Sequence, residues 1–327
     1  MPVSETNLVT RENIGEKSRG WKRKWHENYL VMYSSVWDGY CAEPELWALP
    51  PDDHMAHRGD GVFESFKCVD GKAYCLDEHL ERLAASAGAL GIVLPPAFAR
   101  TREILKTAYR LGKTKDIVIR ICVSRGPGSF TVNPYDSAGS EYYLITQRHK
   151  PPDPALYERG ASVVSAPFPA KVEFAGIKSC DYLHNVLVKK HAKDMGADHA
   201  VSYDPEGFLT EGPTENAAVV TDDGKLLAPP WEKILKGITL SRVMDLAKGL
   251  VGEGKLKFVG NGDIKGDRLP EGIREAFLTT TSFNVLPVTL WNGKKVGDGK
   301  PGPVARELGR LIEEEIRGNG PRATPLD

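Results

Sequence analysis

GIKSCDYLHN, residues 176–185, places one lysine, Lys178, between a short apolar lead-in and the predicted start of a helix. A buried or half-buried lysine is costly unless its charge is lost or paired. An amine whose pKa is lowered by its surroundings is a nucleophile toward aldehydes, and this is how a Schiff base forms. A solvated surface lysine is the ordinary alternative. Lys178 is therefore our first candidate for a catalytic residue.

The residues that a pyridoxal phosphate site requires beside such a lysine are also present in the chain. The site needs a carboxylate facing the ring nitrogen, and an arginine with backbone N–H groups for the phosphate. The sequence offers Glu211 in LTEGPTEN, Arg82 in EHLERL, and a helix start after Gly237 in LKGITLSR. These residue types suit pyridoxal 5′-phosphate as the cofactor.

The segments around Lys178 mix strand-like and helical patterns without a regular βαβ rhythm, which predicts an α+β fold. We expect strands within 59–76, at 116–124, from 161 to 168 and at 276–288, and a hairpin at 199–212. Helices are expected at 77–90, 182–195, 239–252 and 304–318. In the strand at 116–124, alternation puts Val118, Arg120 and Cys122 on one face.

Two domains are predicted on either side of a segment rich in proline and charge, KPPDPALYERG (150–160), which we interpret as a linker. Residues 1–149 form the N-terminal small domain, with a polar arm at about 1–30. Residues 161–327 form the C-terminal domain. The segment MYSSVWDGYCAEPELWALPP (32–51) gives no recognisable opening strand.

Composition excludes several classes of function. The chain has 327 residues, of which 41% are hydrophobic, and a net charge of −1, so no global field favours nucleic acid or an anionic membrane. WKRKW (21–25) is more simply a solvated arm than a nucleic-acid site.

The cysteines and histidines indicate neither a disulfide framework nor a metal site. The five cysteines form no CxxC pair, and the eight histidines form no HExxH motif. The N-terminal stretch lacks an apolar signal core, and no run of about 18 apolar residues occurs. We therefore expect a cytoplasmic protein with no metal, no nucleic-acid partner and no membrane span.

Seven stretches, in order, resemble the fold type IV (class IV) pyridoxal-phosphate aminotransferases, a family that includes branched-chain and D-amino-acid aminotransferases and aminodeoxychorismate lyase. They are HRGDGVFESFK, LDEHLERLAASA, VIRICVSRG, GIKSCDYLHNVL, GFLTEGPTENAAVV, LKGITLSRV and FLTTTSFNVLPV. The resemblance implies a two-domain fold, with a smaller N-terminal α/β sandwich and a larger C-terminal pseudo-barrel. It also implies a homodimer in which the partner's loop near residues 126–134 completes each active site.

The resemblance also assigns roles to individual residues. Lys178 matches the Schiff-base lysine, Glu211 the carboxylate at the ring nitrogen, and Arg82 the phosphate-binding arginine. Further cofactor contacts are implied for four positions: Tyr182, Ile238, Thr239 and Thr281. Glu64 matches a residue of the substrate pocket. Ordinary structural roles stay open for three of the surrounding residues: Tyr182 in packing, Glu64 in a salt bridge and Asn216 in a turn.

The substrate is less determined, because the usual carboxylate-binding residues are replaced. Val118 stands where branched-chain enzymes carry a tyrosine, and Phe130 and Val132 replace the Arg-x-His pair of the D-amino-acid enzymes. We expect Arg58, Arg120 and Ser282 to bind substrate, with an internal Arg120–Glu64 pair as the alternative. The predicted reaction transfers an amino group between an amino acid and a 2-oxo acid, in a branched-chain-like or a D-amino-acid-like enzyme. A lyase of the aminodeoxychorismate type, releasing pyruvate, is the alternative.

Overall fold

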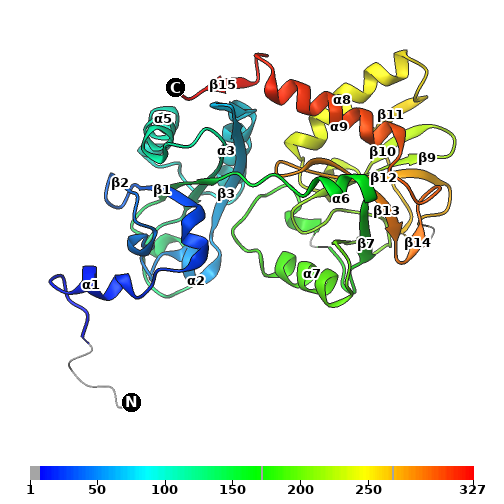
Figure 1. Cartoon of the computed structure of the whole chain (residues 1–327). Helices are drawn as coiled ribbons and strands as arrows, with labels where there is room; N and C mark the ends of the chain where they lie inside the picture. The colour runs from blue at the N-terminus through cyan, green and yellow to red at the C-terminus, as the bar shows by residue number, and fades with distance from the viewer. Residues whose placement is uncertain (1–7, 171, 267–268) are drawn as a thin grey trace.

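Two β-sheets, each packed against helices, carry the fold (Figure 1). The computed structural model describes residues 8–170, 172–266 and 269–327. The two sheets lie in separate halves of the molecule, and an extended segment crosses between them before α6 (Pro154–Arg159). The expected α+β organisation is confirmed, since strands and helices are mixed without a repeating βαβ unit.

The first sheet is antiparallel throughout, in the order β15-β4-β3-β5-β6-β1-β2. Its strands are β1 (Tyr29–Ser34), β2 (Gly39–Cys41), β3 (Gly61–Val69), β4 (Lys72–Tyr74), β5 (Ile117–Ser124), β6 (Glu141–Arg148) and β15 (Ala323–Pro325). The helices of this half and of the segment before it are α1 (Ile14–Arg19), α2 (His54–Arg58), α3 (Leu76–Ala89), α4 (Pro96–Ala99) and α5 (Thr101–Gly112).

The alternation of β5 separates the two faces of this sheet. Ile117, Ile119 and Ile121 are buried in one core with residues of α3 and α5. Arg120 between them is exposed, and it pairs in register with Ser65 of β3. The face opposite α3 and α5 is therefore the one that can present polar side chains to a site.

The second sheet is mixed, in the order β11-β10-β9-β12-β13-β7-β8, with β14 added beside β13. Its strands are β7 (Ala161–Ser165), β8 (His199–Val201), β9 (Asn216–Thr221), β10 (Lys225–Ala228), β11 (Phe258–Asn261), β12 (Ile273–Thr280), β13 (Asn284–Trp291) and β14 (Lys294–Lys295). The remaining helices are α7 (Leu183–Asp194), α8 (Ile238–Gly252) and α9 (Pro303–Arg317).

Helices α8 and α9 pack on one face of this sheet through Val243 and Leu308, which share a core with Phe277 of β12. The other face surrounds a separate core that includes Leu278 and Trp291. The predicted hairpin at 199–212 is present, with Gly207 N–H donating to Asp204 O across its turn.

Two parts of the fold differ from the expectation. Residues 29–41 form the strands β1 and β2, because Val31 and Tyr33 are buried against α5 although the preceding segment is polar. The last strand, β15, returns to pair with β4 of the first sheet, so the C-terminal segment does not lie wholly in the second half. The predicted boundary at 150–160 otherwise stays a prediction.

None of the described helices is long and apolar enough to cross a membrane.

Candidate active site

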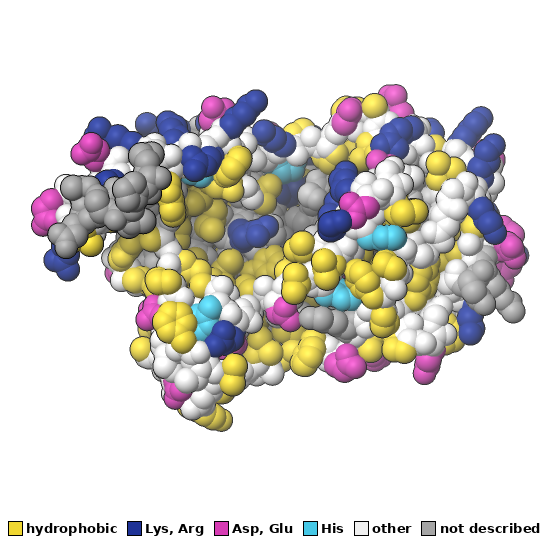
Figure 2. All heavy atoms as spheres, turned by 90° about the horizontal axis from the view of Figure 1, so that it is seen from below, with side chains coloured by type: hydrophobic (Ala, Val, Ile, Leu, Met, Phe, Trp, Pro, Cys, Tyr) yellow, Lys and Arg dark blue, Asp and Glu magenta, His cyan; other side chains and the backbone are white. Residues whose placement is uncertain are grey.

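Two adjoining cavities lie between the halves, and Lys178 lines both of them. The smaller has a volume of about 280 Å³ and contains Glu211 in its wall. The larger, of about 520 Å³, is lined by Arg82, Arg120 and the start of α8. In the view from below, the surface is hollowed between the halves and hydrophobic side chains gather around the hollow (Figure 2).

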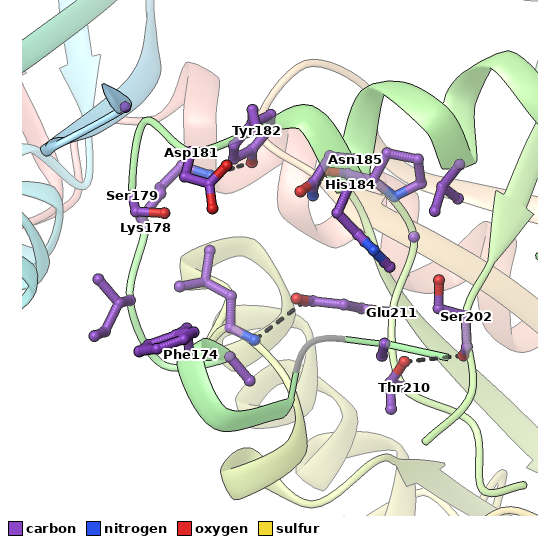
Figure 3. Close-up of a pocket in the computed structure, with 18 of the residues that line it drawn as sticks. Phe174, Lys178, Ser179, Asp181, Tyr182, His184, Asn185, Ser202, Thr210 and Glu211 are labelled. Atoms are coloured by element: carbon purple, nitrogen blue, oxygen red, sulfur yellow. Dashed lines mark hydrogen bonds between the residues drawn. The ribbon is translucent and has the colours of Figure 1, made fainter. Parts of the chain in front are cut away.

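Lys178 is held in place by backbone pairing of its segment with β3. Phe63 N–H donates to Lys178 O at 3.0 Å, and Cys180 N–H donates to Gly61 O at 2.8 Å. The segment therefore continues the first sheet and delivers the lysine to the space between the halves. In Figure 3 the Lys178 side chain lies beside Tyr182, whose hydroxyl is 3.5 Å from Lys178 Nζ.

The Lys178 amine has a lowered affinity for its proton. Burial, and then the positive charge of Arg82, lower the pKa of Lys178 to about 8. The Nζ atom also lies 4.7 Å from the centroid of the Phe63 ring. At pH values near 8 a large share of these amines is uncharged, which is the form that attacks an aldehyde.

Glu211 reaches the cavity from the segment after the hairpin turn and is fixed by two donors. Leu235 N–H donates to Glu211 Oε2 at 3.2 Å, and Asn216 Nδ2 donates to the same oxygen at 2.8 Å. Asn216 also donates to Leu235 O at 2.9 Å, so it ties Glu211 to the segment before α8. Burial raises the pKa of Glu211 to about 8, and a cationic N–H next to it would reverse that shift.

Arg82 of α3 is oriented by Glu64. Arg82 Nε and one terminal nitrogen donate to the two Glu64 oxygens at 2.6 and 2.8 Å, and the other terminal nitrogen donates to Lys236 O at 2.9 Å. Three of its five N–H groups are thus used, and two remain.

Glu64 itself is fully buried and lies 2.7 Å from Nδ1 of His79. Burial opposes its charge, but the hydrogen bonds from Arg82 and His79 prevail and lower the pKa of Glu64 to about 2. Both oxygens of the Glu64 carboxylate accept hydrogen bonds from these partners, and Glu64 does not line either cavity. The geometry therefore speaks against the predicted substrate contact of Glu64 and also against the Arg120–Glu64 pair.

The N-terminus of α8 supplies backbone N–H groups to the larger cavity. Gly237, Ile238 and Thr239 line it, and the first N–H groups of a helix have no partner within the helix. A Cβ atom on Gly237 would lie 1.9 Å from Asn216 Oδ1, so only glycine fits there.

The turn between β12 and β13 lines the opposite wall through Thr281 and Ser282. Thr279 contributes a hydroxyl that is buried and has no hydrogen-bond partner among the described residues. An anion in this cavity would meet N–H and O–H donors from both walls.

Arg120 and Arg58 have different surroundings. Arg120 lines the larger cavity, with its guanidinium 5.4 Å from the centroid of the Phe63 ring, and forms no ion pair with any described residue. Arg58 is exposed and donates to Phe130 O at 2.6 Å. Arg58 lines neither cavity of the single chain. The structure of one chain therefore does not place it at the substrate pocket, where it was predicted.

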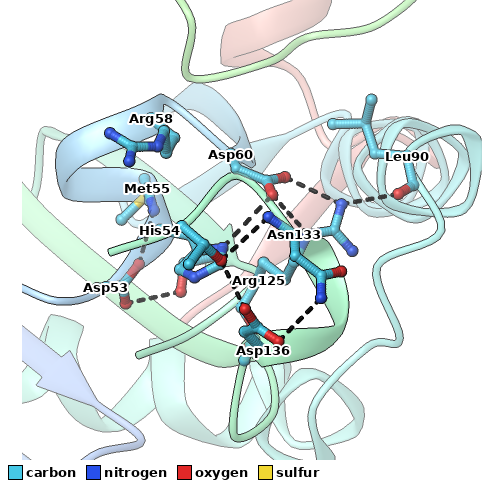
Figure 4. Close-up of polar contacts among 12 residues, drawn as sticks. Asp53, His54, Met55, Arg58, Asp60, Leu90, Arg125, Asn133 and Asp136 are labelled. Atoms are coloured by element: carbon cyan, nitrogen blue, oxygen red, sulfur yellow. Dashed lines mark hydrogen bonds and ion pairs between the residues drawn. The ribbon is translucent and has the colours of Figure 1, made fainter. Parts of the chain in front are cut away.

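The loop after β5 is fixed by a polar network (Figure 4). Arg125 forms an ion pair with Asp60 at 2.5 Å, and His54 Nε2 lies 3.1 Å from Ser129 O. Asp136 accepts hydrogen bonds from several residues of the same loop. The loop therefore holds Phe130 in a defined position although its side chain is 65% exposed.

The structure brings together nine of the eleven predicted site residues around the cavities. These are Arg82, Arg120, Lys178, Tyr182, Glu211, Ile238, Thr239, Thr281 and Ser282. Sequence reasoning missed Thr279, Cys122 and Cys180, which also line the larger cavity. The sequence feature that could have indicated Thr279 is the run of four hydroxyl residues at 279–282.

Comparison with known proteins agrees with this geometry. The family model "Amino-transferase class IV" matches residues 61–291. A chloroplastic D-amino-acid transaminase of Arabidopsis thaliana is 36% identical over 323 residues, covering 98% of this chain and 84% of the relative. A putative branched-chain-amino-acid aminotransferase of Methanocaldococcus jannaschii is 31% identical over 260 residues, covering 78% and 87%.

Among solved structures, a T.th. branched-chain amino acid aminotransferase with pyridoxamine 5′-phosphate superposes with a TM-score of 0.82. It is 26% identical, and the match covers 91% of this chain and 99% of that one. The two-sheet fold is therefore the type IV fold that the sequence motifs predicted. The chain belongs to the class IV aminotransferases, which are enzymes that depend on pyridoxal phosphate.

Proposed function

We propose that this aminotransferase holds pyridoxal 5′-phosphate on Lys178 and uses it to move an amino group from an amino acid to a 2-oxo acid. The observation that carries the proposal is the half-buried Lys178 amine, with its pKa lowered to about 8, open to both cavities. When bound, the cofactor withdraws electrons from the substrate's α-carbon and carries the amino group between the two substrates.

The donor set around the cavities fits this cofactor. Arg82 keeps two N–H groups for a phosphate, and the first turn of α8 adds the N–H groups of Ile238 and Thr239. The hydroxyl of Thr279 lacks a partner that a phosphate or a ring oxygen would supply. Thr281 adds a further hydroxyl on the same wall.

Lys178 has two tasks in this proposal. Its uncharged amine would hold the cofactor through the aldehyde carbon, with loss of water, and the same Nζ atom, once released, would take and return the proton of the substrate's α-carbon. The Tyr182 hydroxyl at 3.5 Å limits where Nζ can move.

Glu211 keeps the ring nitrogen protonated. The pKa of Glu211, near 8 in the chain alone, would fall with a positive N–H group against it, so its ionised carboxylate would accept a hydrogen bond from the protonated ring nitrogen and stabilise that proton. Glu64 acts one step away, because it fixes the direction of Arg82 and touches neither cavity.

Arg120 anchors a substrate carboxylate. It is the cationic side chain on the sheet wall of the larger cavity that no described carboxylate neutralises, and carboxylates bind arginine strongly in sites that exclude water. We infer a D-amino acid as donor and a 2-oxo acid such as 2-oxoglutarate as acceptor. The relative that matches 98% of the chain is named a D-amino-acid transaminase, which supports this choice.

The homodimer and the cytoplasmic location are part of the same proposal. Exposed apolar side chains on α7 and on the loop at 126–134 support a second copy as the partner. The absence of CxxC pairs among the five cysteines supports a reducing compartment.

One preparation tests the cofactor and the substrate together. The purified protein should be yellow, and borohydride should fix the cofactor on Lys178, as peptide mapping would reveal; Lys178→Ala should be colourless. Paired D- and L-enantiomers of several amino acids, assayed with 2-oxoglutarate, should give turnover with the D-forms. Labelling of another lysine overturns the Lys178 assignment. Preference for L-forms overturns the donor, and pyruvate release from aminodeoxychorismate without amino transfer favours the lyase.

A further inference from the structure

A third cavity, of about 450 Å³, lies where the linker, the end of β3, the start of β13 and α9 meet. Ser282 lines both this cavity and the larger active-site cavity, so the turn between β12 and β13 separates the two spaces. Lys178, Arg82 and Glu211 are absent from its wall. We call it the junction cavity.

A buried lysine lies in the wall of the junction cavity. Lys67 of β3 is 4% exposed, and its Nζ donates to Asn284 Oδ1 at 2.7 Å. An ammonium group has three N–H donors, and this neutral amide accepts one of them. Asn284 in turn donates to Glu313 Oε2 at 2.9 Å, so the carboxylate of α9 reaches Lys67 only through the amide. Burial lowers the pKa of Lys67 to about 8 although the nearby Glu313 charge opposes this shift, so an anion beside Nζ would stabilise its charged form.

Two further donors of the junction cavity lack partners among the described residues. His149 Nε2 is buried without a hydrogen bond. Burial, and then the charge of Lys67, lower the pKa of His149, so its ring is neutral and can carry a proton on Nε2. Arg306 of α9 is exposed at the rim of the cavity and makes neither an ion pair nor a side-chain hydrogen bond within the described chain, so its guanidinium is free to turn toward a ligand.

The carboxylates of the junction cavity are already engaged. Asp116 Oδ1 accepts the backbone N–H of Asp70 at 2.8 Å. Glu313 Oε1 accepts from Arg317 Nε at 2.7 Å, while its other oxygen accepts from Asn284. Both oxygens of Glu313 and one oxygen of Asp116 are therefore occupied, whereas Lys67, His149 and Arg306 keep unused donors that suit an anion.

The rest of the wall is apolar. Pro151 of the linker, Phe283 and Val285 line it, together with Pro287 of β13. A ligand that fits must therefore combine a small negative group with an apolar body.

We propose that the junction cavity is a second ligand site, which takes a small carboxylate with an apolar tail. Lys67, Arg306 and His149 hold the carboxylate oxygens, and the tail packs against Phe283 and the prolines. The site is independent of the active-site proposal, because it uses none of the residues assigned there to cofactor binding or catalysis.

Phenylacetate is a suitable probe, since it carries a carboxylate and an apolar ring but no amino or oxo group. Calorimetric titration of the cofactor-loaded protein should give two binding events per chain, one in the active site and one in the junction cavity. Lys67→Met should abolish one event, with at least a tenfold loss of affinity, while Lys67→Arg retains it. Arg120→Met should weaken the other event and leave the junction site intact.

Phenylacetamide, which has the same shape without the charge, should not bind at the junction site. A Lys67→Met protein that melts like the wild type and keeps every binding event unchanged overturns the proposal. If Lys67→Met does not fold, Arg306→Met on the exposed face of α9 decides instead. An unchanged second event in that variant also overturns the proposal.

Discussion

Glu64 and Arg120 lie on neighbouring strands, and the sequence alone cannot separate their roles. In register, Glu64 pairs with Ile121 and Ser65 pairs with Arg120, so the two side chains point to opposite faces of the sheet. Glu64 faces α3 and meets Arg82 and His79, while Arg120 faces the cavity. Residue types and motifs were enough to predict both as functional. The choice between pairing and substrate contact required the strand register, which long-range packing sets.

At this scale we predict that Glu211→Gln keeps the cofactor but slows turnover by about a hundredfold or more. An amide cannot hold the ring proton by charge, although it can still accept the Leu235 N–H at the same position. The absorbance of bound cofactor and kcat should be measured on the same sample. Glu158→Gln, which changes an exposed carboxylate of α6 that lines none of the cavities described, serves as control. Near-native turnover in Glu211→Gln would remove Glu211 from the mechanism.

Arg120 permits a second prediction at the residue scale. Arg120→Met should weaken a dicarboxylate such as 2-oxoglutarate more than a monocarboxylate such as pyruvate, by about 1.5–3 kcal/mol for a lost charged hydrogen bond. The ratio of kcat/KM for the two acceptors measures this effect, and the melting temperature reveals any structural loss.

Arg110→Met on α5, whose guanidinium contacts only Thr107 among the described side chains, is the matched control. A lower melting temperature in Arg120→Met with an unchanged ratio would assign Arg120 a structural role.

At the scale of elements, α7 shows where sequence periodicity stops being informative. The predicted helix at 182–195 is present as Leu183–Asp194. Its apolar positions Leu183, Val186 and Leu187 face outward, whereas Val188 and Ala192 are buried against the second half. Periodicity identifies a helix with an apolar face, but it does not say whether that face meets the chain's own core or another chain.

The start of α8 gives a prediction at the same scale. Gly237→Ala should destabilise the protein by about 1–3 kcal/mol, the usual cost of overpacking, because its Cβ would collide with Asn216 Oδ1 at 1.9 Å. Displacing Asn216 also frees Glu211, so cofactor affinity should fall as well.

Gly249→Ala in the same helix is the matched control, since a Cβ there meets nothing within 4 Å. This change should be neutral or stabilising by up to about 1 kcal/mol, because alanine favours the helix. Thermal melts and cofactor titration distinguish the two variants. Equal behaviour of both would contradict the role assigned to Gly237.

At the scale of the whole molecule, the ordered motifs predicted the fold, and the catalytic centre that they imply stays a prediction, since cofactor chemistry restricts residue types at those positions. They did not predict the hairpin of β1 and β2 or the return of β15 to the first sheet. Both features depend on which edge of a sheet is free, and no local pattern encodes that.

The exposed apolar positions of α7 and of the loop after β5 lead to the last prediction. Leu183 is 66% exposed and Val132 is 83% exposed, and the polar network of Figure 4 keeps the loop ordered in spite of this exposure. Large contiguous apolar patches are rare on monomeric soluble proteins and mark interfaces with a partner. We expect sedimentation to give twice the chain mass of 35.9 kDa.

The double variant Leu183→Glu/Leu187→Glu should sediment as a monomer and lose activity, because charges placed in an apolar interface cannot be solvated. Leu111→Glu on α5, at a position 49% exposed on the outer side of the first sheet, should remain dimeric and active. A wild-type monomer with full activity, or a double variant that sediments like the wild type, would assign these apolar side chains to the surface of a single chain.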